Sequence, residues 1–103
     1  MQVLAIDKMI KAVDDSELMK HLPEELAATV KLYLDEKVRT FYFRKDRPGI
    51  IFIMEADSLE DAKESLITLP LVKVGILNFD LIPIGPLLPL GTLFPQFGDV
   101  LDK

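Results

Sequence analysis

The sequence predicts an α+β fold in which two helices cover one face of a four-stranded antiparallel sheet. Three observations predict it. Short runs of alternating, β-branched or aromatic residues indicate strands, two longer runs with apolar residues at helical spacing indicate helices, and the two kinds of run alternate along the chain. Their order is strand, helix, strand, strand, helix, strand, which is the split βαβ or ferredoxin-like arrangement. Right-handed crossovers place both helices on the same face of the sheet.

The first half of the chain supplies a strand and a helix. Residues 2–10, "QVLAIDKMI", predict the first strand, and the turn formers of 11–22 include Ser16, which can cap a short helical turn. We expect a longer helix to begin at Pro23, because proline suits the first helical position and the two glutamates that follow favour the positive end of a helix. Its predicted apolar stripe consists of Leu26, Val30, Leu34 and Val38.

The middle of the chain predicts a hairpin and a second helix. Residues 39–44, "RTFYFR", and 50–56, "IIFIMEA", indicate two strands, and 45–49, "KDRPG", indicates the turn between them. Ser58 begins the second helix, with Asp61 three residues later as in a capping box. The apolar stripe of this helix consists of Leu59, Ala62, Leu66 and Leu69.

The last strand and the tail define the domain. Pro70 marks the end of the second helix, and residues 76–84, "ILNFDLIPI", indicate the fourth strand. Pro83 cannot donate to a sheet ladder, so this strand should lie at an edge or lose its pairing near its end. We therefore assign residues 1–84 to one ferredoxin-like domain. Residues 85–103 form a proline-rich apolar tail, expected to pack on a neighbouring subunit or, alternatively, on its own domain.

Composition excludes several classes of protein. The 103 residues suffice for one domain with its own core, and the absence of cysteine excludes disulfides and sulfur-based metal sites. A formal charge of −5 repels phosphate backbones, so no nucleic-acid partner is expected. The apolar stretch 69–94 is long enough to span a membrane, but prolines and glycines interrupt it, and a continuous helix cannot form there. We expect a cytoplasmic protein with no membrane partner.

One face of the predicted sheet has no helix to cover it. If that face is apolar it must be buried elsewhere, and sheet-to-sheet association with a second copy is the natural outcome. We therefore expect a homodimer, a dimeric α+β barrel. The residues assigned to the uncovered face are Val3, Ala5, Met9, Thr40, Tyr42, Ile50, Phe52, Met54, Ile76 and Ile82.

The pattern over 32–87 resembles the muconolactone delta-isomerase-like proteins. The "LPL" at 69–71, which ends the second helix before the last strand, carries most of the resemblance. It implies a dimeric α+β barrel or a larger ring of dimers, no cofactor, and a proton transfer on a small lactone. Arg44 matches an arginine at the end of the family's second strand. The enzyme that names the family carries histidines on its first strand and in its hairpin, whereas 2–10 and 45–49 contain none.

Polar residues on the predicted uncovered face are candidates for chemistry. Asp7 and Asp80 lie on neighbouring strands, and two carboxyl groups in an apolar pocket share a proton, so one of them would act as a base. Arg44 would hold a substrate carboxylate and Tyr42 would donate to a developing enolate. The expected catalytic residues are Asp7, Tyr42 and Asp80, and the expected substrate-binding residues are Arg44, Asn78, Phe52 and Met54.

Simpler interpretations of the same residues stay open. Asp7 lies near a strand end where water or Lys8 can satisfy it, Arg44 belongs to a charged hairpin, and Tyr42 suits a core or an interface. His21, the only histidine, precedes "LPEE" and suits a helix start or a surface. No metal site is expected. The two functional hypotheses are a cofactor-free isomerase acting on a small organic molecule, and a non-catalytic protein that assembles or binds a small apolar ligand.

Overall fold

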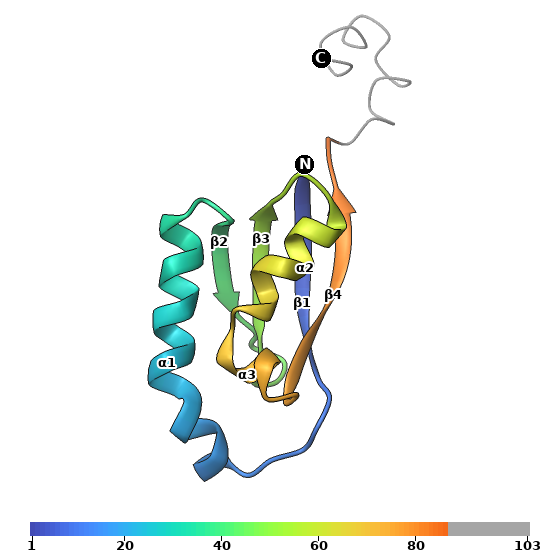
Figure 1. The fold of residues 1–103 in the computed structure, drawn as a ribbon. Coiled ribbons are helices and arrows are strands. Elements are labelled where there is room, and N and C mark those ends of the chain that lie inside the picture. Colours follow the sequence, from blue (N-terminus) through green and yellow to red (C-terminus); the bar gives the residue numbers. More distant parts are fainter. Residues whose placement is uncertain (87–103) are drawn as a thin grey trace, which may run out of the picture.

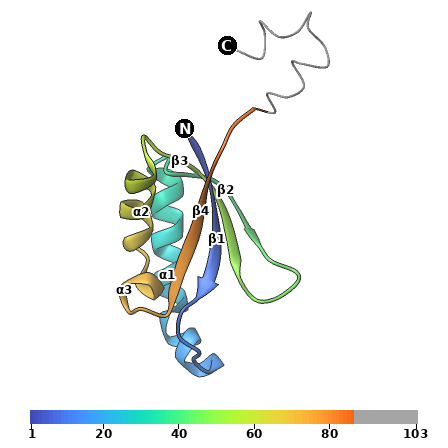
Figure 2. The same cartoon turned by 90° about the vertical axis from the view of Figure 1, so that its right-hand side faces the viewer.

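The structure, a computed structural model, describes residues 1–86 and confirms the predicted fold class. β1 (Gln2–Met9) lies inside a four-stranded antiparallel sheet, between β3 (Ile50–Glu55) and β4 (Leu77–Ile84), and β2 (Val38–Phe43) lies beyond β3. The helices are α1 (Asp15–Leu34), α2 (Leu59–Ile67) and the short α3 (Pro70–Lys73). All three lie on one side of the sheet, and the other side carries no element of the described chain (Figures 1 and 2). Figure 1 shows α1 beside β2, at the flank of the other helices.

α1 begins eight residues before the position that the sequence predicts. The carboxylate of Asp14 accepts a 2.9 Å hydrogen bond from the backbone N–H of Glu17, which caps the helix. This bond and a second one from the hydroxyl of Ser16 lower the pKa of Asp14. Pro23 therefore lies inside the helix instead of starting it, and the carbonyl of Met19 loses the N–H that would ordinarily bond to it.

α2 follows the prediction closely. The hydroxyl of Ser58 accepts a 3.0 Å bond from the N–H of Asp61, and the carboxylate of Asp61 accepts a 2.9 Å bond from the N–H of Asp57. Pro70 does end this helical run, but it also begins α3, at whose first turn a proline is well tolerated. β4 is an edge strand and contains Pro83, as expected.

The core corrects the predicted faces of β1 and β3. Residues that we assigned to the uncovered face instead point toward the helices and are fully buried, namely Val3, Ala5, Phe52 and Met54. They pack with Leu32, Val38, Ala62, Leu66, Leu69 and Phe79. The rings of Phe52 and Phe79 stack with centroids 5.4 Å apart. A phase error of one residue exchanges the two faces of a strand, and β1 is apolar on both faces, so alternation could not decide between them.

The open face of the sheet consists of the alternate residues. Its apolar side chains are Leu4, Ile6, Ile51, Ile53, Ile82 and Ile84, joined by Thr40 and Tyr42. Tyr42 and Ile82 are exposed and the other apolar side chains are half-buried. The predicted placement of Thr40, Tyr42 and Ile82 on this face agrees with the structure, whereas Ile76 is buried ahead of β4.

The apolar stripe predicted for α1 also needs correction. Glu25, Thr29 and Leu32 are buried, whereas Leu26, Val30 and Leu34 are exposed. Val38 is buried but belongs to β2. Among residues 1–86, no helix is long and apolar enough to cross a membrane. From residue 87 onward the tail lies outside the described residues, so its packing stays a prediction.

Candidate functional site

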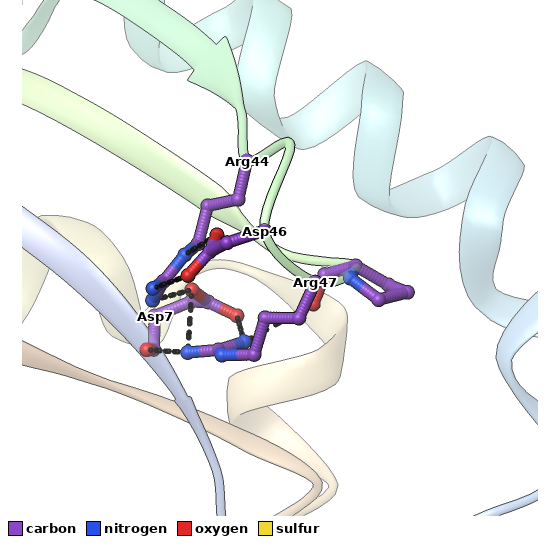
Figure 3. A network of polar contacts seen from close by, with 5 residues as sticks. Asp7, Arg44, Asp46 and Arg47 are labelled. Atoms are coloured by element: carbon purple, nitrogen blue, oxygen red, sulfur yellow. Dashed lines mark hydrogen bonds and ion pairs between the residues drawn. The ribbon is translucent and has the colours of Figure 1, made fainter.

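Asp7 lies at the centre of a charged cluster near the end of β1. Its side chain is only 2% exposed and points to the helix side of the sheet. Arg47 donates to both carboxylate oxygens at 3.0 and 3.3 Å, and a further N–H of Arg47 donates to the backbone carbonyl of Asp7 at 3.0 Å. Arg44 approaches the same carboxylate at 3.6 Å (Figure 3). Two guanidinium groups from the β2–β3 hairpin therefore compensate one buried carboxylate.

Arg44 is oriented by the turn that follows it. Its Nε donates to Oδ1 of Asp46 at 2.9 Å, and Nη2 donates to the other oxygen, so the pair is bidentate (Figure 3). This hydrogen bonding, with the positive charge of Arg44, lowers the pKa of Asp46 to about 2 and raises that of Arg44. The guanidinium is thus held between an exposed carboxylate and the buried one.

Gly49 makes the close approach of the hairpin to β1 possible. A Cβ atom at this position would lie 2.5 Å from Oδ2 of Asp7 and 2.8 Å from its Cγ. Any other residue would therefore displace the carboxylate or the hairpin. The "PG" that the sequence offered as a turn signal has a second purpose, which is to leave room for the side chain of Asp7.

A cavity of about 290 Å³ adjoins this cluster, between the sheet, α1 and α3. Its walls are mostly apolar and its polar side chains are few, which is typical of small-molecule sites. The sheet contributes Phe52, Leu77 and Phe79, α1 contributes Leu18, Leu22 and Leu26, and the segment at α3 contributes Leu69 and Leu71. The polar side chains that line it are Asp7, Arg44, Glu25 and Thr29.

Glu25 is the functional candidate that sequence reasoning missed. It lies on the cavity side of α1 and is 9% exposed, and burial raises the pKa of its carboxyl group. A long 3.4 Å bond from the N–H of Leu71 and the nearby His21 oppose this shift in part. A signal was present in the sequence: Glu25 lies seven residues from both Leu18 and Leu32, so it shares the stripe that faces the sheet.

The structure separates the residues that we expected to act together. Asp7 and Arg44 do meet, as described above. Asp80 lies on the opposite, open face, where its carboxylate pairs with Lys8 at 3.0 Å, so Asp7 and Asp80 cannot share a proton. Tyr42 and Asn78 also lie exposed on the open face. The prediction that Asp7 pairs with Asp80 is therefore wrong. The prediction that Tyr42 and Arg44 act in one pocket is wrong as well, because Tyr42 lies on the open face and Arg44 lines the cavity on the helix side.

Phe52 and Met54 lie deeper than expected. Phe52 lines the cavity from the helix side, while Met54 is enclosed in the core. His21 is half-buried within α1, 3.6 Å from a carboxylate oxygen of Glu17. Within residues 1–86, no three acidic, histidine or cysteine side chains gather in a way that suits a metal ion.

Comparison with known proteins shows the fold. The chain is similar in structure to the 5-chloro-2-hydroxyhydroquinone dehydrochlorinase of Burkholderia phenoliruptrix AC1100, solved in complex with 2,5-dihydroxybenzoquinone. The TM-score is 0.67 and the identity 19%, and the match covers 84% of this chain and 95% of the other. No protein-family model matches the sequence, and no curated protein matches it. At this identity the likeness establishes the shared fold and leaves the chemistry to the residues of this chain.

Proposed function

We propose that this protein binds a small organic molecule carrying a carbonyl or carboxylate group, and isomerises it by moving a proton without a cofactor. The observation that carries the proposal is the joint lining of one apolar cavity by Glu25, whose pKa is raised, and by the Asp7–Arg44 pair. A carboxylate with a raised pKa is a better proton acceptor near neutral pH than an ordinary one. The similar fold of an enzyme that acts on a hydroxyhydroquinone is consistent with a small cyclic substrate.

In this proposal the two ends of the cavity have different tasks. Glu25 takes a proton from a carbon next to the substrate carbonyl and returns it at another carbon. Arg44, at the hairpin end, donates hydrogen bonds to the substrate carboxylate or to the enolate oxygen that forms. Asp7 acts through the two arginines, because its carboxylate holds Arg47 against the end of β1 and lies beside Arg44. The apolar walls exclude water from the reacting carbon.

We further propose that the open face of the sheet is buried against a second copy, as in a dimeric α+β barrel. The half-buried isoleucines of β3 and the exposed Ile82 give this face an apolar centre. Such a dimer would enclose Tyr42, Asn78 and Asp80, and they remain candidates for a role there. Assignment to the muconolactone isomerase-like family and a cytoplasmic location belong to the same proposal.

The alternative function is non-catalytic binding of a small apolar ligand. The predominance of leucine and phenylalanine in the cavity favours it. The two functions differ in what they require of Glu25, because a binding protein needs only the shape of the side chain whereas an isomerase needs a carboxylate that accepts and returns a proton.

The test uses muconolactone as the reaction probe and 2,5-dihydroxybenzoquinone as the binding probe. In Glu25→Gln the reaction should slow at least a hundredfold, while the dissociation constant for the quinone, measured by calorimetry, changes less than threefold. Glu24→Gln is the matched control, because Glu24 is the exposed neighbour on the same helix. Binding of the quinone with no turnover of the lactone by the unmodified protein would favour the alternative. Binding of neither probe would contradict both.

A further inference from the structure

α1 has three distinct sides instead of two. At about 100° per residue, the side that faces the sheet carries Leu18, Glu25, Thr29 and Leu32. A second side carries the charged residues Glu17, Lys20, Glu24, Lys31 and Asp35. The third side, between them, is apolar from Met19 to the end of the helix and consists of Met19, Leu22, Pro23, Leu26, Ala27, Val30, Tyr33 and Leu34. An ordinary surface helix has one apolar side, which faces the core.

The third side is exposed, and it continues onto β2. Its large residues are 40% to 72% exposed. The ring of Tyr33 meets that of Phe41 edge-to-face with centroids 6.0 Å apart, and Phe43 joins Leu22 and Leu26 in lining the cavity. We call Met19, Leu22, Leu26, Val30, Tyr33, Leu34, Phe41 and Phe43 the α1–β2 surface. Figure 1 shows that the outer flank of α1 has no neighbour among the described elements.

The size of the α1–β2 surface suits a protein partner. With ~200 Å² for a fully exposed large side chain, its eight residues expose on the order of 800 Å². One partner in a standard-size protein interface buries about 800 Å². An isolated monomer rarely exposes a contiguous apolar patch of this extent. Because the centre of the patch carries no charge, it suits an apolar partner surface better than a charged ligand.

The spacing of the residues on α1 suits a second copy of the same helix. If two α1 helices meet antiparallel about a two-fold axis at Leu26, Leu22 lies opposite Val30 and Met19 lies opposite Tyr33. Each pair joins two apolar residues, so the surface is complementary to itself, which a two-fold interface requires. The same register brings Asp15, at the start of one helix, to the C-terminal end of the other, where Lys37 lies three residues beyond Leu34. Within residues 1–86 neither of these two charges forms an ion pair.

We propose that α1 docks antiparallel on α1 of a second copy, with the two-fold axis at Leu26. This contact is independent of the proposed function and lies on the opposite side of the sheet from the proposed sheet-to-sheet contact. A chain with both contacts assembles beyond a dimer. Because Leu22, Leu26 and Phe43 also line the cavity, the partner's helix covers part of the cavity's open side.

Cysteine cross-linking tests the register directly, because the chain contains no cysteine of its own. Leu26→Cys places a thiol on the proposed axis, where it faces its own copy at a distance that a disulfide can span. Under mild oxidation at micromolar concentration, we expect the disulfide-linked dimer to form at least tenfold faster than in Lys31→Cys. Lys31 is the matched control, since it is exposed on the charged side of the same helix. Equal rates for the two variants would overturn the proposal.

A charge exchange gives a second, independent test. Leu26→Glu should break the contact between the two α1 helices, so the molar mass measured by light scattering should fall by half. The melting temperature should fall little, because Leu26 is half-exposed. Asp15→Lys should weaken association in the same assay, and adding Lys37→Asp to it should restore the assembly. A third experiment mixes Leu26→Cys chains with Leu93→Cys chains. If the disulfide between the two kinds of chain forms faster than the disulfide between two Leu26→Cys chains, the C-terminal tail binds this surface. That result would overturn the proposal.

Discussion

The two faces of the sheet are similar in composition and different in what they do. Both carry apolar residues on the central strands β1 and β3, yet only the helix side gathers charged groups around a cavity. There Asp7 meets two arginines, whereas on the open face Asp80 makes a single exposed pair with Lys8. The difference shows that hydrophobicity along a strand does not identify the face that carries the cavity. What identifies it is the set of elements that the fold brings over the strand.

The largest expected effect compares the two faces of β3. Phe52→Ala removes a buried ring that stacks on Phe79, and it should lower the free energy of unfolding by about 3–5 kcal/mol. Ile53→Ala, on the open face, should cost about 1 kcal/mol in the isolated chain. Urea unfolding at several protein concentrations measures both. If the open face is an interface, the loss of stability in Ile53→Ala rises with protein concentration. Equal losses for Phe52→Ala and Ile53→Ala at low concentration would contradict the assigned faces.

The next comparison concerns the two aspartates. Asp7→Ala leaves Arg47 and Arg44 without their shared carboxylate at a buried strand end, and it should cost about 2–3 kcal/mol. Asp80→Ala removes an exposed pair and should cost less than about 0.5 kcal/mol. Chemical denaturation gives both values. A larger loss for Asp80→Ala would show that the open face, and not the helix side, contains the structured charges.

A smaller effect is expected where the hairpin approaches β1. Gly49→Ala places a Cβ against the carboxylate of Asp7, and overpacking of this kind costs about 1–2 kcal/mol. Gly85→Ala is the control, because among residues 1–86, its chain neighbours aside, no atom lies within 4 Å of the position that its Cβ would occupy. A melting temperature for Gly49→Ala equal to that of Gly85→Ala would mean that the hairpin lies further from Asp7.

The smallest effect is a pH dependence that belongs to the helix side alone. Burial raises the pKa of Glu25 above its ordinary value of 4.5, so the folded state favours the protonated carboxyl. The stability that this gives is complete below the unfolded-state pKa and is lost as the pH rises through the folded-state pKa. Melting temperatures from pH 3.5 to 8 should therefore decline less in Glu25→Gln than in the wild type. Glu24→Gln should keep the wild-type profile, and a wild-type profile in Glu25→Gln would contradict the raised pKa.

The sequence predicted those parts of the fold that depend on local signals. Ser58 with Asp61 located the start of α2, and Pro83 located an edge strand, because capping and the lack of an N–H act over a few residues. The start of α1 was missed because Asp14 is an equally good cap and the helix tolerates Pro23. The faces of β1 and β3 were missed because apolar residues occupy both sides of these strands, and only tertiary packing selects one.

The candidate site was predictable to a lesser degree. Asp7 and Arg44 are predicted as polar groups of the uncovered face, and Arg44 also from the resemblance, whereas the structure brings the two together on the helix side. The sequence places Arg47 in a charged turn, since nothing local reveals that the hairpin folds over β1. Glu25 was treated as a charge at a helix start, and its burial depends on where α1 meets α3. The spacing of Glu25 from Leu18 and Leu32 indicates which side of α1 it shares, but not that α3 lies against that side.

Methyl NMR with 2,5-dihydroxybenzoquinone tests the central claim, that the functional cavity lies on the helix side, most directly. Each face has its own methyl probes, because Leu22, Leu26, Leu69 and Leu77 line the cavity while the open face carries Ile6, Ile51, Ile53 and Ile82. We predict that the quinone shifts the methyl signals of Leu22, Leu26, Leu69 and Leu77 and leaves those four isoleucines in place. Shifts confined to Ile51, Ile53 and Ile82 would place the ligand on the open face and contradict the account.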